Sequence, residues 1–158
     1  MTSLNIGCGK RKYRGYTTID IDSENLPDIV GDFRTMDFKD VDEIRAEHLL
    51  EHFGRDEGIQ VLKLWHKWLK DGGLLIVETP DFEGICKDFA MDKYWMTRHA
   101  YGSQNADWAY HRDGWYEEKF RTLFPNIGFE IISIVKNHSR KILPNIKVIA
   151  IKHGIQHS

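Results

Sequence analysis

Cysteine is scarce in this chain of 158 residues, and long apolar runs are missing. The two cysteines, Cys8 and Cys86, lie in unrelated contexts, which argues against a disulfide framework and against a zinc cluster held by thiolates. No apolar run approaches the roughly 20 residues that a membrane-crossing helix needs, and the first residues do not have the pattern of a secretory leader. We therefore expect a cytoplasmic location and no membrane partner.

The chain also lacks an excess of charge of either sign. It has 22 basic and 24 acidic residues, for a formal net charge of −2, so no global field attracts nucleic acid or a membrane surface. Nucleic acid stays open as a partner only through local contacts. There is no internal repeat and no linker rich in glycine or proline, and the length suits one core. We predict a single domain over residues 1–158.

Short apolar segments alternate with turns along the whole chain. Between residues 55 and 70 the apolar positions recur at helical spacing, and Asp71-Gly72-Gly73 is expected to end that helix. A second helix is predicted near residues 115–124. This alternation favours an α/β fold with a mostly parallel sheet and an antiparallel final strand, whose first crossovers are too short for full helices. The predicted strands are residues 4–7, 16–21, 28–31, 43–46, 74–79, 129–135 and 146–152.

The clearest motif follows the first strand, at Asn5-Ile6-Gly7-Cys8-Gly9. Glycine lets the backbone turn sharply and approach a ligand with no Cβ in the way, so we interpret this segment as a ligand-binding loop. A tight turn without a ligand is the alternative. The third glycine of a dinucleotide fingerprint is missing, and residues 10–14 are too few and too basic for a helix that would hold a pyrophosphate. Both features count against NAD and FAD.

Acidic residues stand where the second and third strands end. Asp20, followed by Ile21 and Asp22, can accept hydrogen bonds from both hydroxyls of a ribose, although two aspartates that begin a turn would look the same. Asp32 and Phe33 follow the third strand, where a carboxylate and an aromatic ring could hold an adenine. Because ligands of parallel sheets bind beyond the carboxyl ends of the strands, we expect these groups to share one site.

Taken in order, these segments resemble those of the class I S-adenosylmethionine-dependent methyltransferases, and within them a group of short predicted members. The resemblance covers most of the chain and rests on LNIGCG, TTIDID, VGDF, EIRAEHLLEHF, LKDGGLLIVETPD, and YGSQ followed by H-x-x-G-W. It implies a Rossmann-like, seven-stranded sheet, S-adenosylmethionine as the cofactor, and methyl transfer to an acceptor. A non-catalytic protein of the same fold, which binds the cofactor or acts as a scaffold, is the alternative.

The resemblance also assigns the cofactor contacts. It gives the glycine turn to the methionine side, Asp20 to the ribose, and Asp32 with Phe33 to the adenine. Glu47 and His48 end the fourth strand, beneath the methionine and the sulfonium. The residues expected to bind the cofactor are Asn5, Gly7, Cys8, Gly9, Asp20, Ile21, Asp32, Phe33, Glu47 and His48.

A rival motif overlaps this region. His48-Leu49-Leu50-Glu51-His52 matches H-x-x-E-H, an inverted zinc-peptidase signature whose histidines lie four apart on one helical face. A zinc metallopeptidase is therefore a second alternative. It is disfavoured, because the motif falls where the fourth strand ends and the chain is short for a third ligand and a substrate scaffold. We assign no residue to a metal.

Aromatic residues are concentrated between residues 81 and 120, which hold ten of the nineteen in the chain. We interpret residues 81–113 as an insertion that forms a lid over the cofactor and binds the acceptor. The alternative is that rings such as Trp95 replace the missing helices in the core. Because histidine and tyrosine can act as general bases, the candidate catalytic residues are His111, Tyr101 and His99.

The acceptor and the oligomeric state have weaker signals. We expect a small-molecule or glycan-like acceptor, and the basic residues at 10–14, Lys136, Arg140 and Lys141 would suit an anionic group on it. With short first crossovers, one face of the sheet would lack helical cover, so the lid or a second subunit must hide any apolar surface there. A homodimer is expected on this ground.

Overall fold

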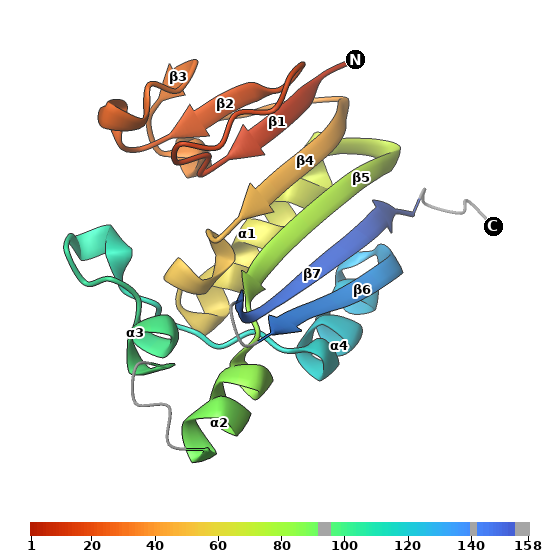
Figure 1. The fold of residues 1–158 in the computed structure, drawn as a ribbon. Helices are drawn as coiled ribbons and strands as arrows, with labels where there is room; N and C mark the ends of the chain where they lie inside the picture. Colours follow the sequence, from red (N-terminus) through yellow and green to blue (C-terminus); the bar gives the residue numbers. More distant parts are fainter. Residues whose placement is uncertain (92–95, 140–141, 154–158) are drawn as a thin grey trace.

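Seven strands form one sheet in the computed structural model, which describes residues 1–91, 96–139 and 142–153. The order along the sheet is β3-β2-β1-β4-β5-β7-β6, with β7 antiparallel to both neighbours and the other pairs parallel (Figure 1). This confirms the predicted α/β fold class and the antiparallel final strand. The strands are β1 (Ser3–Ile6), β2 (Thr17–Asp20), β3 (Ile29–Val30), β4 (Val41–Glu47), β5 (Leu69–Pro80), β6 (Phe129–Ser139) and β7 (Ile142–Lys152).

Four α-helices occur in the described ranges: α1 (Arg55–Trp68), α2 (Phe82–Ala90), α3 (Met96–Tyr101) and α4 (Glu117–Ile127). The first helix ends two residues before the predicted boundary, because β5 already begins at Leu69. Asp71-Gly72-Gly73 therefore does not end a helix; it lies in the opening part of β5, where the pairing with β4 shifts register. The second predicted helix continues past Pro125 and ends at Ile127, where Gly128, with a φ of 106°, caps it.

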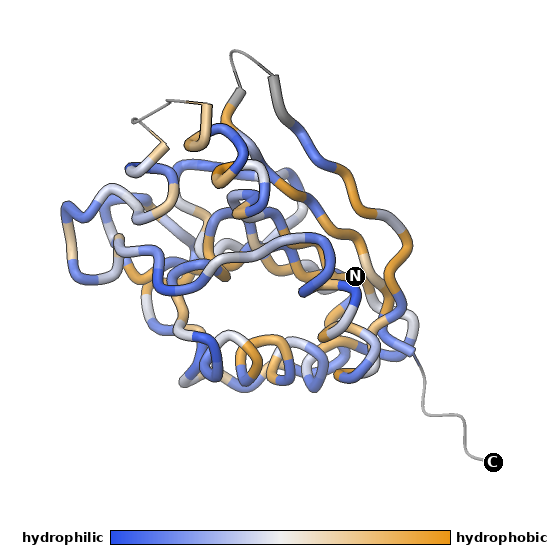
Figure 2. The backbone as a smooth tube through the Cα atoms, turned by 90° about the horizontal axis from the view of Figure 1, so that it is seen from below, coloured by the Kyte–Doolittle hydropathy of each residue, from blue (hydrophilic) through white to orange (hydrophobic). Residues whose placement is uncertain are grey.

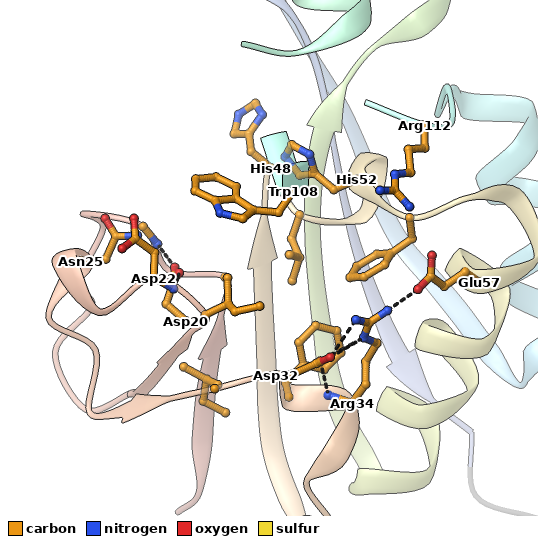
Figure 3. Close-up of a pocket in the computed structure, with 18 residues that line it drawn as sticks. Asp20, Asp22, Asn25, Asp32, Arg34, His48, His52, Glu57, Trp108 and Arg112 are labelled. Atoms are coloured by element: carbon orange, nitrogen blue, oxygen red, sulfur yellow. Dashed lines mark hydrogen bonds and ion pairs between the residues drawn. The ribbon is translucent and has the colours of Figure 1, made fainter. Parts of the chain in front are cut away.

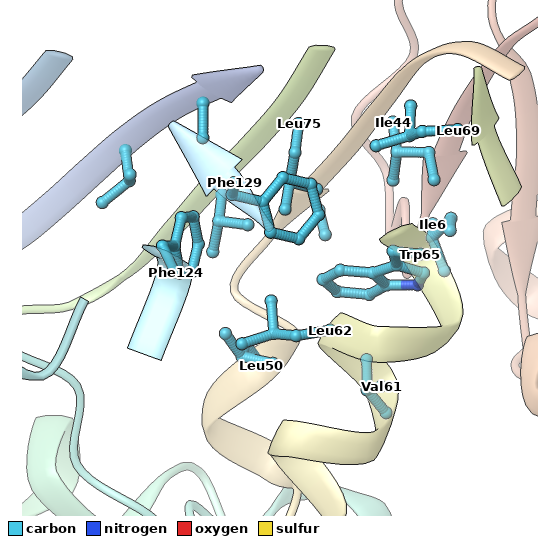
Figure 4. Packing of buried hydrophobic residues seen from close by; sticks show 14 of the residues in the cluster. Ile6, Ile44, Leu50, Val61, Leu62, Trp65, Leu69, Leu75, Phe124 and Phe129 are labelled. Atoms are coloured by element: carbon cyan, nitrogen blue, oxygen red, sulfur yellow. The ribbon is translucent and has the colours of Figure 1, made fainter. Parts of the chain in front are cut away.

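The hydrophobic core lies on the side of the sheet that α1 and α4 cover (Figures 1 and 4). In α1 the buried residues include Leu62 and Trp65, three positions apart on one face, as expected for a helix that packs on a sheet. Figure 2, which colours the backbone by hydropathy, shows hydrophilic and hydrophobic residues alternating along the helical turns. Phe124 of α4 meets Phe129 of β6 with ring centroids 5.4 Å apart. Because each fully buried large apolar side chain contributes about 1.5–3 kcal/mol, this cluster stabilises the sheet that carries the site.

The first two crossovers contain no α-helix, as expected, and neither does the third: they form turns and the 3-10 helices Ser23–Asn25 and Phe33–Thr35. A polar and aromatic network occupies the face opposite the core instead. Arg45 of β4 lies 4.4 Å from the ring centroid of Tyr13, and the Tyr13 hydroxyl donates a 2.7 Å hydrogen bond to Glu47. The short loop after β1 thus covers part of a face that a helix would otherwise cover.

The insertion is more helical than the sequence indicated, because α2 and α3 lie within residues 81–113. The aromatic rings in the insertion and next to it divide into buried and exposed ones. Trp115, just after it, is buried in the core, whereas Tyr101 and Trp108 are 61% and 51% exposed. Trp95 lies outside the described residues. The role of the insertion as a lid stays a prediction.

Two further expectations concern the surface. Within the described ranges we find no helix with the length and hydrophobicity of a membrane span. On β6, Ile132 and Val135 are 56% and 48% exposed, so part of the sheet does present apolar side chains to the surroundings. The homodimer that would cover such residues stays a prediction.

Candidate functional site

A cavity of about 430 Å³ opens at the carboxyl ends of the parallel strands β1, β2, β3 and β4 (Figure 3). Four of its walls follow directly from these strand ends, namely the glycine turn after β1, the acidic end of β2, the turn after β3 and the end of β4, and the beginning of α1 adds another. The volume is within the range typical of small-molecule sites. Seven of the predicted cofactor residues line it, namely Gly7, Gly9, Asp20, Ile21, Asp32, Phe33 and His48.

The turn after β1 needs glycine for two reasons. Gly7 has a φ of 63°, a left-handed conformation that side chains disfavour. A Cβ at Gly7 would also lie only 2.8 Å from Leu49 Cδ1. The Gly7 N–H donates a 2.8 Å hydrogen bond to Ile19 O, which fixes the turn against β2. At this turn the chain therefore presents backbone atoms, and no side chain, to the cavity.

Asp20, the last residue of β2, holds the glycine turn in place. Its Oδ2 accepts a 2.7 Å hydrogen bond from the Gly9 N–H, and its Oδ1 accepts a 2.9 Å bond from the Asp22 N–H. A carboxylate oxygen can accept a second hydrogen bond, so both oxygens keep capacity for a ligand. Asp20 thus fixes the conformation of the glycine loop and also lines the cavity.

Asp32 is already paired in the structure. Arg34 forms a fork on this carboxylate, with Nε 2.9 Å from Oδ1 and Nη2 2.7 Å from Oδ2. The Arg34 guanidinium holds the pKa of Asp32 below its usual range. Arg34 also pairs with Glu57 at the beginning of α1. A ligand would therefore meet a fixed ion pair here.

Phe33 lines the cavity from within the core. Its ring packs edge-on against Phe53, with centroids 5.9 Å apart, and it also contacts the rings of Trp65 and Trp68. The side chain is buried, so it closes the floor of the cavity rather than standing free to stack.

His48 is the most unusual residue of the site. Its φ of 56° is rare for a residue other than glycine, and such strain of about 1–3 kcal/mol persists mainly at functional sites. Its Nδ1 lies 3.4 Å from Glu51 Oε1 and its Nε2 lies 3.6 Å from Glu78 Oε1. Burial alone would lower the pKa of His48, but Glu51 and Glu78 raise it to about 9. The ring thus lies between two carboxylates that favour its charged form.

Three predicted cofactor residues lie outside the lining of the cavity. Asn5 is buried and donates from Nδ2 to Arg11 O, so it supports the loop from behind. Cys8 is also buried, and burial raises the pKa of its thiol. Glu47 points to the opposite face of the sheet, where it accepts from Tyr13 and Arg45. All three are placed to shape the loop and the strand end.

A second cavity, of about 700 Å³, adjoins the first at His48, which lines both. Two of the three candidate catalytic residues, His99 and His111, line it, and burial lowers the pKa of each. Tyr101 does not; it lines a third hollow, together with α4 residues and with His111, which lines the second cavity as well. The structure thus brings the two histidines, but not the tyrosine, to the junction with the first cavity.

The basic residues predicted to bind an anionic group on the acceptor are only partly free to do so. Arg11 lines the second cavity, although its guanidinium also pairs with Glu47 at 2.9 Å. Lys136 is held by Glu83 and Glu117, at 2.8 and 3.3 Å. Arg140 and Lys141 lie outside the described residues.

The peptidase motif does not form the helix that its two histidines would need. His48 has left-handed backbone, and only Leu50–His52 form a 3-10 turn. His48 therefore pairs with Glu51 and Glu78, while His52 turns to the insertion and bonds Tyr110 O at 3.0 Å.

Several lining residues could not be found from sequence motifs. Trp108 and Arg112 come from the insertion, and Figure 3 shows the Trp108 indole projecting into the cavity near His48. Their sequence signal was only the general enrichment in aromatics. Asn25, Arg34 and Glu57 follow strand ends or begin α1, positions at which polar residues are common without a ligand.

No protein family and no curated protein matches this chain in sequence. Solved structures do match it in fold. A SAM-dependent methyltransferase from Methanosarcina mazei has a TM-score of 0.68 at 18% identity over 96% of this chain and 92% of its own. One from Archaeoglobus fulgidus has a TM-score of 0.67 at 14% identity, over 96% and 86%. Magnesium protoporphyrin IX methyltransferase from Synechocystis, with bound SAH, has a TM-score of 0.70 at 12% identity, over 96% and 74%. The chain therefore has the class I methyltransferase fold.

Proposed function

We propose that this protein is a methyltransferase that binds S-adenosylmethionine in the cavity at the strand ends and transfers its methyl group to an acceptor in the second cavity. The observation that carries the proposal is the junction at His48: the glycine turn, Asp20 and Asp32 line one cavity, and a second cavity meets it at the end of β4. A sheet of this topology binds ligands at this edge.

The residues present fit the proposed cofactor. Gly7 and Gly9 leave room for its amino-acid end, Asp20 would accept from the ribose hydroxyls, and the wall at Asp32 and Phe33 would hold the adenine. The cofactor supplies an electrophilic methyl group on a sulfonium.

The second cavity would receive a small-molecule or glycan-like acceptor. Arg11 and Arg98 line it and would suit a carboxylate or phosphate on that acceptor. His99 and His111 would be neutral at pH 7, because burial lowers the pKa of both. A neutral imidazole can take a proton from an acceptor hydroxyl or ammonium, and positioning alone would suffice for an acceptor that is already nucleophilic.

Isothermal titration calorimetry with S-adenosylmethionine and S-adenosylhomocysteine tests the cofactor. We expect one equivalent of either ligand to bind, and Asp20→Ala to weaken both without unfolding the protein. Asp37→Ala is the matched control, because Asp37 is an exposed carboxylate that pairs only with Lys67 among the described residues. Absence of binding by either ligand to the folded protein would contradict the proposal.

A turnover assay separates an enzyme from a binding or scaffold protein of the same fold. The protein is incubated with S-adenosylmethionine that carries a radiolabelled methyl group and with fractionated pools of sugars, small acids and amines. We expect label in one fraction, and less of it with His111→Ala. Cofactor binding with no transfer to any pool, protein or nucleic acid would favour the non-catalytic alternative.

A further inference from the structure

We propose that Glu51, His52 and His111 bind one divalent transition-metal ion, zinc or iron(II), between the two cavities. Each side chain offers one donor atom, and these three atoms all lie within 4.8 Å of one another. Two imidazoles and a carboxylate suit such ions, whereas magnesium and calcium prefer oxygen ligands. Three protein ligands also leave a coordination position open, as in catalytic zinc sites.

The Glu51 carboxylate is the main indication that this cluster binds a cation. Its side chain is 2% exposed, and neither oxygen accepts a hydrogen bond from any residue in the described ranges. The nearest nitrogens, His48 Nδ1 at 3.4 Å and His111 Nε2 at 4.0 Å, lie beyond the usual hydrogen-bond distance. Because a buried carboxylate whose oxygens accept no hydrogen bond is costly, a cation bound to it would stabilise the fold.

The two histidines are oriented as metal ligands commonly are. His52 Nδ1 lies 3.0 Å from Tyr110 O, and His111 Nδ1 lies 3.0 Å from His99 O. A carbonyl oxygen can only accept, so each Nδ1 carries a proton, and in the neutral imidazole the Nε2 lone pair is the one that can bind a metal. Histidines that bind metals usually donate their other N–H to a carbonyl or carboxylate in this way.

The segments that carry these ligands are tied to each other. The Arg112 N–H donates a 2.8 Å hydrogen bond to Glu51 O, which joins the turn at Leu50–His52 to the end of the insertion. Donor atoms bound to one zinc ion lie roughly 3.3–3.5 Å apart. The 4.0 Å between His111 Nε2 and Glu51 Oε1 therefore needs only a small side-chain adjustment.

The position of the ion indicates its use. His52 lines the first cavity and His111 lines the second, so the ion would stand at their junction and its open position could hold an oxygen atom of the acceptor. This use rests on the proposed function, whereas the binding of the ion does not. With the ion bound, His111 is a ligand, so His99, which lines the same cavity, is the imidazole that would take a proton from the acceptor. The site also differs from the peptidase motif, because His48 is not among its ligands.

Metal titration of the whole protein tests the site. The protein is purified without chelators or a metal-affinity tag, stripped of metal, and titrated in separate arms with Zn²⁺, with Fe²⁺ in the absence of oxygen, and with Mg²⁺, each against a colorimetric chelator. We expect one equivalent of Zn²⁺ or Fe²⁺ and no competition from Mg²⁺. His52→Ala and His111→Ala should weaken binding by more than about a hundredfold, the upper end of what loss of an outer partner alone costs.

His153→Ala is the matched control, because His153 is an exposed histidine that pairs with Glu130. Circular dichroism checks that each variant is folded. If a variant does not fold, the visible absorption of the Co²⁺-loaded wild-type protein still reports histidine ligation. The proposal is overturned if the wild-type protein binds neither ion in stoichiometric amount, or if the site variants bind it as tightly as His153→Ala does.

The same samples are titrated with S-adenosylhomocysteine. Binding of S-adenosylhomocysteine without metal binding would refute the metal site and leave the proposed function standing. Metal binding without S-adenosylhomocysteine binding would support the site and contradict the proposed function.

Discussion

Replacement of Asp20 by asparagine should affect both the stability and the ligand affinity of this protein. In the folded chain its two oxygens accept from the Gly9 and Asp22 N–H groups, at 2.7 and 2.9 Å. The asparagine side chain has one oxygen and one NH₂ group, so one of these backbone donors would face another donor. Loss of a hydrogen bond to a charged group costs about 1.5–3 kcal/mol, and the site is nearly buried. We expect the free energy of unfolding in urea to fall by about that amount.

The effect on cofactor affinity follows from the same carboxylate. If one charged hydrogen bond to a ribose hydroxyl is lost, affinity should fall by about 10- to 150-fold, the equivalent of 1.5–3 kcal/mol. Calorimetry with S-adenosylhomocysteine measures this at a temperature where the variant is folded. Asp22→Asn is the comparison, because Asp22 also lines the cavity but its Oδ1 accepts from the Glu24 N–H. Unchanged affinity in Asp20→Asn together with a loss in Asp22→Asn would refute our assignment of the ribose contact.

Three further variants test other parts of the structure. Gly7→Ala should abolish cofactor binding, because the new Cβ would clash with Leu49 and the backbone φ is 63°. Gly72→Ala is the control: its φ is 76° but no atom lies near the new Cβ, so it should cost only backbone strain of about 1–2 kcal/mol and leave binding unchanged. Equal effects of the two variants on cofactor binding, measured by calorimetry, would contradict this. Trp65→Ala should lower the free energy of unfolding in urea by about 3–5 kcal/mol, since the ring is fully buried under the sheet, and a loss below about 1 kcal/mol would show that the core is packed differently. Arg34→Ala should raise the pKa of Asp32 towards its usual value, as NMR titration of the carboxyl carbon would show. Because the pKa of Asp32 is depressed in the folded chain, its contribution to stability is present above pH about 4 and is lost as the pH falls further; a pKa that does not respond to Arg34→Ala would contradict the fork.

The fold could be predicted largely from the sequence because local patterns and topology agree. Strand segments end in glycine or aspartate, and the crossovers after β1, β2 and β3 are too short for helices, so only a limited number of sheet arrangements remain. The positions of Gly7, Asp20 and Asp32 followed from the rule that ligands bind at the carboxyl ends of parallel strands. These residues line the cavity as expected.

Other parts of the site depend on which way a side chain points. Glu47 was expected beneath the ligand, but it shares the face of Arg45 because residues alternate along a strand, and Ile44 and Ala46 occupy the core side. This alternation was visible in the sequence. Asn5 similarly alternates with the buried Leu4 and Ile6 and points to the loop side, where it bonds Arg11 O.

The contribution of the insertion could not be predicted from the sequence. Trp108 and Arg112 reach the cavity, and His111 reaches Glu51, only because the chain returns over the end of β4 after α3. That return depends on contacts such as the bond from the Arg112 N–H to Glu51 O, which join residues 61 positions apart. Local propensity contains no information about such pairs.

The most direct test of the central claim is a crystal structure of the protein with S-adenosylhomocysteine. We expect the ribose hydroxyls on Asp20, the adenine against the wall at Asp32 and Phe33, and the sulfur beside His48, facing the second cavity. Ligand bound elsewhere, or bound with its sulfur turned away from His48 and the second cavity, would contradict it.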